Sequence, residues 1–150
     1  MPGAESLRSR QYYAHPHNAF WPIMGALLGF DARAPYARRA RSLKAARIAL
    51  WDVLHSCTRE GSLDTRIEDE TANDFAVFFR NHPALTHVFF NGAKAEASFR
   101  RHVRPRLGGA LRGRALRLVR LPSTSPAHAG LPRARKLAAW RAILRAEEKP

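Results

Sequence analysis

The chain has 150 residues, of which 45% are hydrophobic, enough for one domain that buries about two thirds of its unfolded surface. Its longest apolar runs, such as residues 48–51 and 88–90, are far shorter than the about 20 residues that cross a bilayer. Cys57 is the only cysteine, which excludes an intramolecular disulfide and agrees with a reducing compartment. With no secretory signal at residue 1, we expect a cytoplasmic, bacterial protein that does not bind membranes.

The formal charge is +14, from 26 Lys and Arg against 12 Asp and Glu. Residues 97–146 contain 13 basic side chains and no acidic one. Such a one-sided distribution attracts phosphate backbones without any sequence preference. A solvated surface in an arginine-rich proteome is the alternative. The placement of the acidic residues favours nucleic-acid binding.

The first predicted element is a helix over 19–28, with Asn18 at the N-cap position and Gly29 at its end. A loop follows over 31–36, and an Ala- and Arg-rich helix over 37–46. The compact apolar run 48–54 indicates a buried strand whose carboxyl end is marked by Asp52.

The second half of the chain continues the alternation of helices and strands. The sequence predicts a helix over 74–80 capped by Asn73, a strand over 86–91, a helix over 93–102, a strand over 115–121 and a helix over 133–146. This order predicts an α/β layer fold with a mostly parallel sheet. Ligands bind such sheets at the carboxyl ends of their strands, where Asp52, Asn91 and Ser123 are expected.

Residues 11–21 are dense in aromatic and polar side chains. Tyr12 and Tyr13 precede a His-Pro turn and belong to no periodic face, so they are candidates for stacking on a nucleic-acid base. Phe20 and Trp21 fit a core position as well as a stacking position. Asn18 fits a helix N-cap and also a catalytic amide that orients water and favours a developing cation; the two roles are compatible.

Residues 121–129, Leu-Pro-Ser-Thr-Ser-Pro-Ala-His-Ala, follow the last predicted strand. A rigid loop with prolines and hydroxyls can present O–H and N–H groups to phosphate, although a plain linker has a similar composition. His128 is a further candidate for contact with a phosphate or with the leaving base. Four potential metal ligands, His15, His17, His55 and Cys57, have no zinc-motif spacing, so we expect neither a metal nor another cofactor.

These segments resemble the uracil-DNA glycosylase superfamily, and most closely its sixth family, the hypoxanthine-DNA glycosylases. The resemblance rests on five segments in the family's order: residues 1–3, 11–21, 49–63, 89–95 and 121–129. It implies a three-layer α/β/α fold with a small, mostly parallel sheet. It also implies hydrolysis of the N-glycosidic bond of deaminated bases in DNA, chiefly hypoxanthine, as the first step of base excision repair.

The resemblance further implies a role for each motif residue. Asn18, in His-Pro-x-Asn, is matched to the water-positioning amide, because Met1 stands where mismatch-specific relatives have their Asn. Tyr13, directly before Ala14-His15-Pro16, is matched to the aromatic that stacks on the flipped base, and His15 is a further substrate-binding candidate. Asp52 stands where uracil enzymes have the Asn that reads the base, and Asn91 is a second base contact.

The last segment is matched to the family's loop that enters the minor groove. Its DNA-binding candidates are Ser123, Thr124, Ser125 and His128, followed by Arg133. The family's motif begins with His, and Leu121 replaces it here. The strand that leads into residues 1–3 in the family is absent, so we expect residues 1–150 to be one glycosylase domain shortened at its start.

The resulting hypothesis is a monomeric, monofunctional enzyme that binds DNA through a basic face over 100–141 and leaves an abasic site. No lysine lies in the motifs, so no amine nucleophile is expected. A non-catalytic nucleic-acid-binding protein is the main alternative, because the charge alone would suffice for it. A metal-dependent hydrolase is the third.

Overall fold

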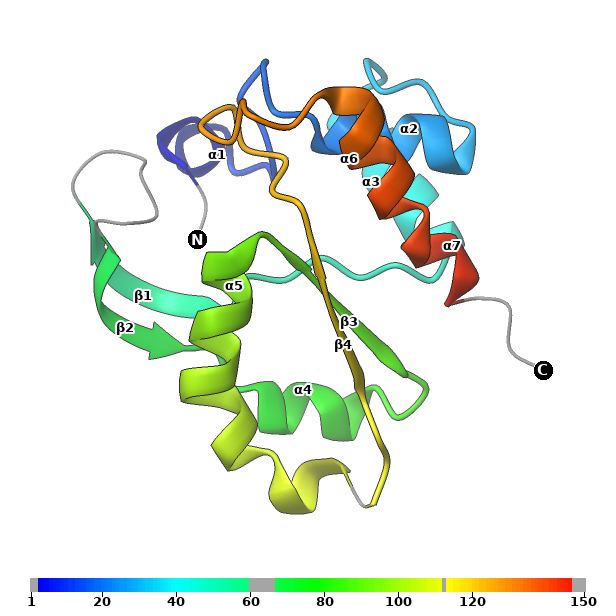
Figure 1. Ribbon diagram of the computed structural model, residues 1–150. Coiled ribbons are helices and arrows are strands. Elements are labelled where there is room, and N and C mark those ends of the chain that lie inside the picture. Colours follow the sequence, from blue (N-terminus) through cyan, green and yellow to red (C-terminus); the bar gives the residue numbers. More distant parts are fainter. Residues whose placement is uncertain (1–2, 60–66, 112, 147–150) are drawn as a thin grey trace. The chain divides into compact units, whose positions relative to one another are not determined.

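The computed structural model describes residues 3–59, 67–111 and 113–146. They form two compact units (Figure 1), which we describe separately. Unit 1 is built from residues 52–122, and unit 2 from the residues before and after that stretch. Unit 2 is therefore discontinuous in sequence.

Unit 2 is helical in its described residues. Its elements are α1 (Ala4–Ser9), α2 (Phe20–Leu28), α3 (Tyr36–Ala45), α6 (Arg133–Trp140) and α7 (Ala142–Arg145). The side chains buried in this unit include Phe20, Trp21, Ile23, Met24, Leu43, Trp140 and Ile143. The Trp140 ring meets Phe20 edge to face at 5.7 Å, so α6 packs on α2 although more than a hundred residues separate them.

Unit 1 contains two pairs of strands. β1 (Leu54–Arg59) and β2 (Ile67–Ala72) pair antiparallel, and β3 (His87–Asn91) and β4 (Arg117–Leu121) pair parallel. In the parallel pair, Asn91 lies opposite Leu121. The carboxyl ends of β3 and β4 therefore lie at the same edge.

The helices of unit 1 are α4 (Phe75–Asn81) and α5 (Ala93–Ser98). α5 continues into a π-helix, η2 (Phe99–Val103), and two 3-10 turns, η3 (Arg104–Arg106) and η4 (Gly108–Leu111). Their apolar side chains form a core with β3 that consists of Phe75, Phe79, Phe90, Phe99, Val103 and Leu107. The Phe99 ring lies 5.3 Å from Phe75 and 5.1 Å from Phe90, in tilted or edge-on arrangements that aromatic pairs prefer.

Several predicted elements are confirmed with small shifts in their ends. Helices 19–28 and 37–46 are α2 and α3, and strands 86–91 and 115–121 are β3 and β4. Gly29 ends α2 in the left-handed conformation, with φ of 74°, as expected of a glycine after the last turn. In the part of the chain that the structure describes, no helix is long and apolar enough to cross a membrane.

The predicted strand over 48–54 is wrong. Residues 48–53 have no regular structure, β1 begins only at Leu54, and the Trp51 side chain is 40% exposed. The chain leaves α3 through Arg47 with φ of 53°, and the ladder to β2 starts at Leu54 opposite Ala72. Before that point the chain has no strand of this sheet to pair with, so its apolar composition does not produce one. Asp52 accordingly precedes a strand instead of ending one.

Three helix predictions also need correction. The cap of α4 is Asp74, whose carboxylate accepts from Val77 N at 3.0 Å, whereas Asn73 donates its amide to the carbonyl of Asp52 at 2.8 Å. Helix 93–102 is divided between α5 and η2, ahead of Pro105, which cannot donate the next helical bond. Helix 133–146 is interrupted at Arg141.

Candidate active site

Residues 11–21, which we call the amide segment, are held by hydrogen bonds within the segment and by a bond to α3. The carbonyl of Tyr12 accepts from the Trp21 indole N–H at 2.9 Å, and Tyr12 N donates to the Tyr36 hydroxyl at 3.3 Å. Asn18 N donates to the carbonyl of His15 at 2.9 Å, which closes a turn over His-Pro-His-Asn. These bonds fix both ends of the segment.

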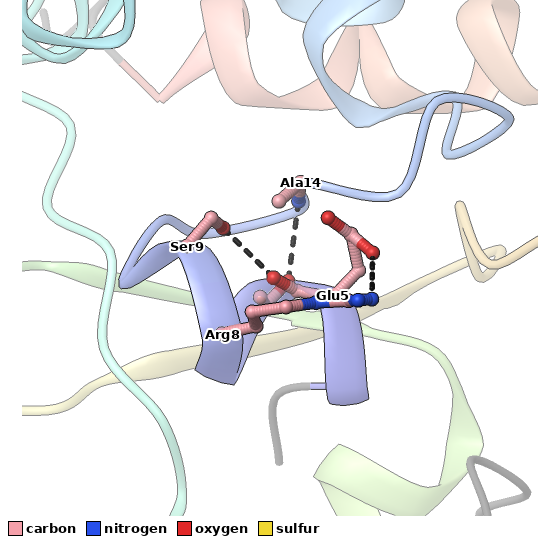
Figure 2. Close-up of polar contacts among 5 residues, drawn as sticks. Glu5, Arg8, Ser9 and Ala14 are labelled. Carbon is pink, nitrogen blue, oxygen red and sulfur yellow. Dashed lines mark hydrogen bonds and ion pairs between the residues drawn. The ribbon is translucent and has the colours of Figure 1, made fainter.

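Helix α1 supports the middle of the amide segment. Ser6 is 9% exposed; its hydroxyl accepts from Ala14 N and its carbonyl accepts from Gln11 N, each at 3.1 Å. Figure 2 shows Ala14 facing α1, together with the bond from the Ser9 hydroxyl to the carbonyl of Glu5 and the pair of Arg8 with Glu5. Neither α1 nor the role of Ser6 was predicted from the sequence, because residues 4–9 contain no apolar period.

Tyr13 occupies a conformation that bulky residues rarely adopt. Its φ is 54°, in the left-handed region where a side chain with Cβ is strained. Its ring stacks on Phe20 with the centroids 4.0 Å apart and the planes at 24°. The bonds of Tyr12 and Ala14 on either side, together with this stack, hold the Tyr13 backbone in place.

Asn18 lies two residues before helix α2. The N-cap position, which the sequence predicted for Asn18, is occupied by Ala19. The Asn18 amide oxygen still accepts from Phe20 N, at the first helical residue, at 2.9 Å. A carboxamide oxygen has two lone pairs, and this bond uses one of them. The bond to Phe20 N orients the amide and is compatible with a second bond to water.

His15 is exposed, and its Nδ1 accepts from His17 N at 3.2 Å. The two imidazole rings are 5.5 Å apart. Among the described residues, no three His, Cys, Asp or Glu side chains gather in a way that would hold a metal ion.

Residues 123–128, which we call the Ser loop, are folded by their own hydroxyls. The Ser123 hydroxyl accepts from Ser125 N, and the Ser125 hydroxyl accepts from Ala127 N, both at 3.2 Å. The carbonyl of Ser125 accepts from His128 N at 3.0 Å. Since a hydroxyl has one donor besides its acceptor sites, Ser123 and Ser125 keep an O–H that suits a phosphate oxygen.

The amide segment and the Ser loop meet directly. Ala19 N, next to Asn18, donates to the carbonyl of Thr124 at 3.0 Å, and Thr124 is 1% exposed. One backbone bond thus joins two segments that lie more than a hundred residues apart. It places Tyr13, His15, Asn18 and the Ser loop in unit 2.

Asp52 and Asn91 belong to unit 1. Asn91 is the last residue of β3 and lies half-buried at the edge where β4 also ends. This is the position at which parallel sheets bind ligands. Asp52 is half-buried, and its carbonyl is bonded to the Asn73 amide.

The basic residues of 97–146 divide by their contacts. Arg114 donates to the carbonyls of Phe79, Pro83 and Leu85, and both Arg100 and Arg120 pair with Glu96. Arg133, the first residue of α6, is exposed. The other exposed arginines of this stretch include Arg104, Arg106, Arg117, Arg135 and Arg141.

Lys136 was not among the site residues predicted from the sequence. Its side chain is 5% exposed, its ammonium donates to the carbonyl of His128 at 2.8 Å, and burial lowers its pKa. The available signal was its helical spacing from Trp140 and Ile143, both of which are buried.

Comparison with known proteins identifies relatives that agree in name, although no family model matches the chain. A hypoxanthine DNA glycosylase of Methanosarcina acetivorans is 36% identical over 146 residues, which cover 97% of this chain and 86% of that protein. A hypoxanthine DNA glycosylase of Methanosarcina barkeri is 43% identical over 96 residues, which cover 63% of this chain and 61% of that protein.

A solved structure agrees with these relatives. It is the solution NMR structure of a candidate uracil DNA glycosylase from Methanosarcina acetivorans, with a TM-score of 0.73 and 35% sequence identity over 95% of this chain and 86% of that one. The predicted α/β fold of the uracil-DNA glycosylase type is thereby confirmed. With a relative of this identity aligned along nearly its whole length, the chain belongs to the hypoxanthine DNA glycosylase family.

Proposed function

We propose that this chain is a monofunctional DNA glycosylase that hydrolyses the N-glycosidic bond of deaminated bases, chiefly hypoxanthine. The observation that carries the proposal is the bond between Ala19 N and the carbonyl of Thr124. It joins a segment suited to base stacking and water positioning to a loop suited to phosphate. A binding protein without catalysis has no need of this combination.

The amide segment supplies the proposed chemistry on the base and the sugar. Flipping a base out of the duplex costs a few kcal/mol, least for a mispaired base, and stacking on the Tyr13 ring offsets about 1 to 3 kcal/mol of it. As the glycosidic bond lengthens, positive charge develops on the sugar. The Asn18 carboxamide, oriented by its bond to Phe20 N, holds the attacking water and stabilises that charge with its dipole.

The Ser loop and the exposed arginines supply the proposed grip on DNA. The Ser123 and Ser125 hydroxyls already accept backbone N–H bonds. In the proposal, each hydroxyl donates its own O–H to a phosphate oxygen. We assign His128 to the same contact. Thr124, a DNA-binding candidate from the sequence, is 1% exposed and holds the loop to Ala19 through its carbonyl, so it does not reach phosphate. Arg133 adds a charge next to the loop.

Asp52 and Asn91 are the proposed contacts to the edge of the base. A carboxylate accepts N–H bonds only, whereas an amide both donates and accepts. Where uracil enzymes of the family have an Asn, this chain has Asp52, whose carboxylate can accept a hydrogen bond from the ring N–H of hypoxanthine. We assign His15 to the turn that borders the base.

The chain has four lysines, and the surroundings of the three in the described residues support monofunctional hydrolysis. Strand cleavage by a glycosylase needs an amine that attacks the sugar. Lys136 is buried against a backbone carbonyl, Lys94 is paired with Glu70, and Lys44 lies on α3 outside both segments. The proposed product is an intact strand with an abasic site. We propose that the enzyme is a monomer with a single domain, needs no cofactor and acts on DNA in the cytoplasm.

The test separates the two roles of Asn18. Asn18→Ala removes the cap and the amide, while Asn18→Ser keeps a capping hydroxyl and removes only the amide. We expect both variants to lose release of hypoxanthine, uracil and xanthine from lesion-containing DNA. Only Asn18→Ala should also lose about 1 kcal/mol of folding stability.

DNA binding by both Asn18 variants should stay near that of the unmodified protein, measured by fluorescence anisotropy. Base release that persists in Asn18→Ser would contradict the catalytic role. An unmodified protein that binds DNA and releases none of the three bases would instead favour a non-catalytic binding protein.

A further inference from the structure

Lys136 lies beneath the Ser loop. It sits in the first turn of α6, where its own N–H donates to the carbonyl of Pro132 at 3.1 Å. Its side chain extends back to the carbonyl of His128 at 2.8 Å. The ammonium therefore ties the end of the Ser loop to the start of the helix that follows it.

Burial of the Lys136 ammonium costs free energy, and this cost needs an explanation. Burial of an ammonium disfavours its charge, and Lys136, at 5% exposure, is almost fully buried. A methionine or leucine at this position of an amphipathic helix would bury as much carbon without that cost. A buried cation that bonds a loop carbonyl fixes the loop instead of only filling space.

The bond also connects the loop to the core near Asn18. Trp140, one turn after Lys136 on α6, packs on Phe20, and Phe20 N holds the Asn18 amide. Helix α6 therefore contacts the amide segment through Trp140 and the Ser loop through Lys136. These two contacts of α6 fix the distance between the amide segment and the Ser loop, and the bond of Ala19 N to the carbonyl of Thr124 joins them directly.

We propose that Lys136 is a positioning residue for DNA binding, which holds the His128 carbonyl and so keeps the Ser loop in the shape that grips the phosphate backbone. The proposal rests on the proposed function in assigning the loop to DNA. Lys136 itself touches no phosphate. Its loss weakens binding by loosening the loop and leaves the reaction on bound substrate nearly unchanged.

The test compares Lys136→Met with Lys44→Met. Both changes remove one positive charge from unit 2, but Lys44 is exposed on α3, so Lys44→Met measures the effect of charge alone. Dissociation constants for a hypoxanthine-containing duplex are measured over a range of salt, with single-turnover base release at saturating enzyme. Since a hydrogen bond from a charged group is lost, we expect Lys136→Met to bind about tenfold more weakly than Lys44→Met.

Three readouts distinguish positioning from other roles. The slope of the logarithm of the binding constant against the logarithm of the salt concentration should be equal in the two variants, because neither lysine contacts phosphate in the proposal. A slope smaller in magnitude by about 1 in Lys136→Met would mean that Lys136 contacts phosphate directly, and would overturn the proposal. Single-turnover release at saturation should stay within about threefold of the unmodified protein. Lys136→Arg, which keeps a charged donor, should restore binding.

Equal dissociation constants for the two Met variants would also overturn the proposal. Thermal melting checks that each variant is folded. Should Lys136→Met not fold, Lys136→Gln, which is shorter and uncharged, is compared with Lys44→Gln by the same criteria. If the unmodified protein binds DNA and releases no base, the proposed enzyme fails while the comparison of binding still tests the role of Lys136.

Discussion

At Tyr13, a bulky aromatic residue is held with φ of 54°. Such a conformation costs about 1 to 3 kcal/mol and persists only where the surroundings fix it. Here they do so by bonds to the residues on both sides, from Trp21 to Tyr12 and from Ala14 to Ser6. A stacking ring whose position is set before DNA arrives loses little entropy on binding.

Two replacements of Tyr13 should therefore distinguish the contribution of the ring to base release from that of the hydroxyl. Tyr13→Phe keeps the ring and its stack on Phe20, so base release should stay within about twofold of the unmodified protein. Tyr13→Ala removes the stacked ring, worth about 1 to 3 kcal/mol per base, which corresponds to about 5- to 150-fold slower release. Single-turnover release of hypoxanthine measures both, and equal rates for the two variants would contradict the stacking role.

Among the elements, the β1–β2 hairpin is joined to α5 and η2 by a cluster of charges. Glu70 of β2, at 10% side-chain exposure, contacts Lys94 of α5 and lies 3.1 Å from His102 Nε2 of η2. Burial alone raises the pKa of the Glu70 carboxyl, but the hydrogen bond and the charge of Lys94, with contributions from Ser98 and His102, outweigh it. The pKa of Glu70 therefore lies below its ordinary value of 4.5.

The direction of this shift predicts an acid-sensitive contact. A carboxyl whose pKa is lower in the folded state stabilises the fold above about pH 4.5, and the stabilisation is lost as pH falls through the folded pKa. Glu70→Gln should reduce the free energy of unfolding by about 1 to 3 kcal/mol at pH 7. The difference from the unmodified protein should shrink towards pH 3, as measured by urea unfolding.

Glu5→Gln is the matched control for Glu70→Gln. Glu5 also pairs with a basic residue, Arg8, but the two side chains are 40% and 76% exposed. Exposed pairs contribute only about 0 to 1 kcal/mol, so this change should leave unfolding nearly unaltered at every pH. A Glu70→Gln effect as small as that of Glu5→Gln would show that the cluster does not stabilise unit 1.

The elements that could be predicted from sequence are those with a local signal. Helix α2 has an apolar period, a capping Asn18 and a terminating Gly29, and β3 and β4 are β-rich runs bounded by turn residues. An apolar run such as 48–54 shows a tendency to be buried but not whether a strand lies beside it, so that prediction failed. The β1–β2 hairpin, whose described strand residues are mostly polar and exposed, has no such pattern.

The same limit applies to the candidate site. Tyr13, Asn18 and Ser123 could be singled out because aromatic, amide and hydroxyl residues are concentrated in two short segments. Lys136 shares a helical face with the buried Trp140 and Ile143, but a lysine on an amphipathic helix is usually solvated. The sequence does not show that residues 123–132 bring a carbonyl over it. Ser6 acts through a fold-dependent bond to Ala14, which leaves no trace in its own neighbourhood.

At the scale of the whole molecule, the charge of +14 is not all available to DNA. Arg114 is committed to three backbone carbonyls in unit 1, and Glu96 neutralises part of the charge on Arg100 and Arg120. The strength of DNA binding should therefore depend on which arginine is removed, and not only on how many.

Arg133→Ala and Arg114→Ala make this difference measurable. Arg133 is exposed in the first turn of α6, so its loss should reduce the slope of log K against log salt by about 1, the contribution of one phosphate contact. Arg114→Ala should lower the melting temperature and leave the slope nearly unchanged. The reverse assignment of the two effects would refute this division of the arginines.

The discontinuity of unit 2 has a consequence for synthesis on the ribosome, where a chain emerges from its N-terminus. Residues 11–21 leave the ribosome early, yet the carbonyl that holds Ala19 belongs to Thr124. Closure of so long a loop costs little more free energy than closure of one half its length, but it delays the contact until unit 1 has been made. A nascent chain interrupted before residue 123 would carry the residues proposed to stack the base and orient the water. It would lack the Ser loop, whose Thr124 carbonyl holds Ala19.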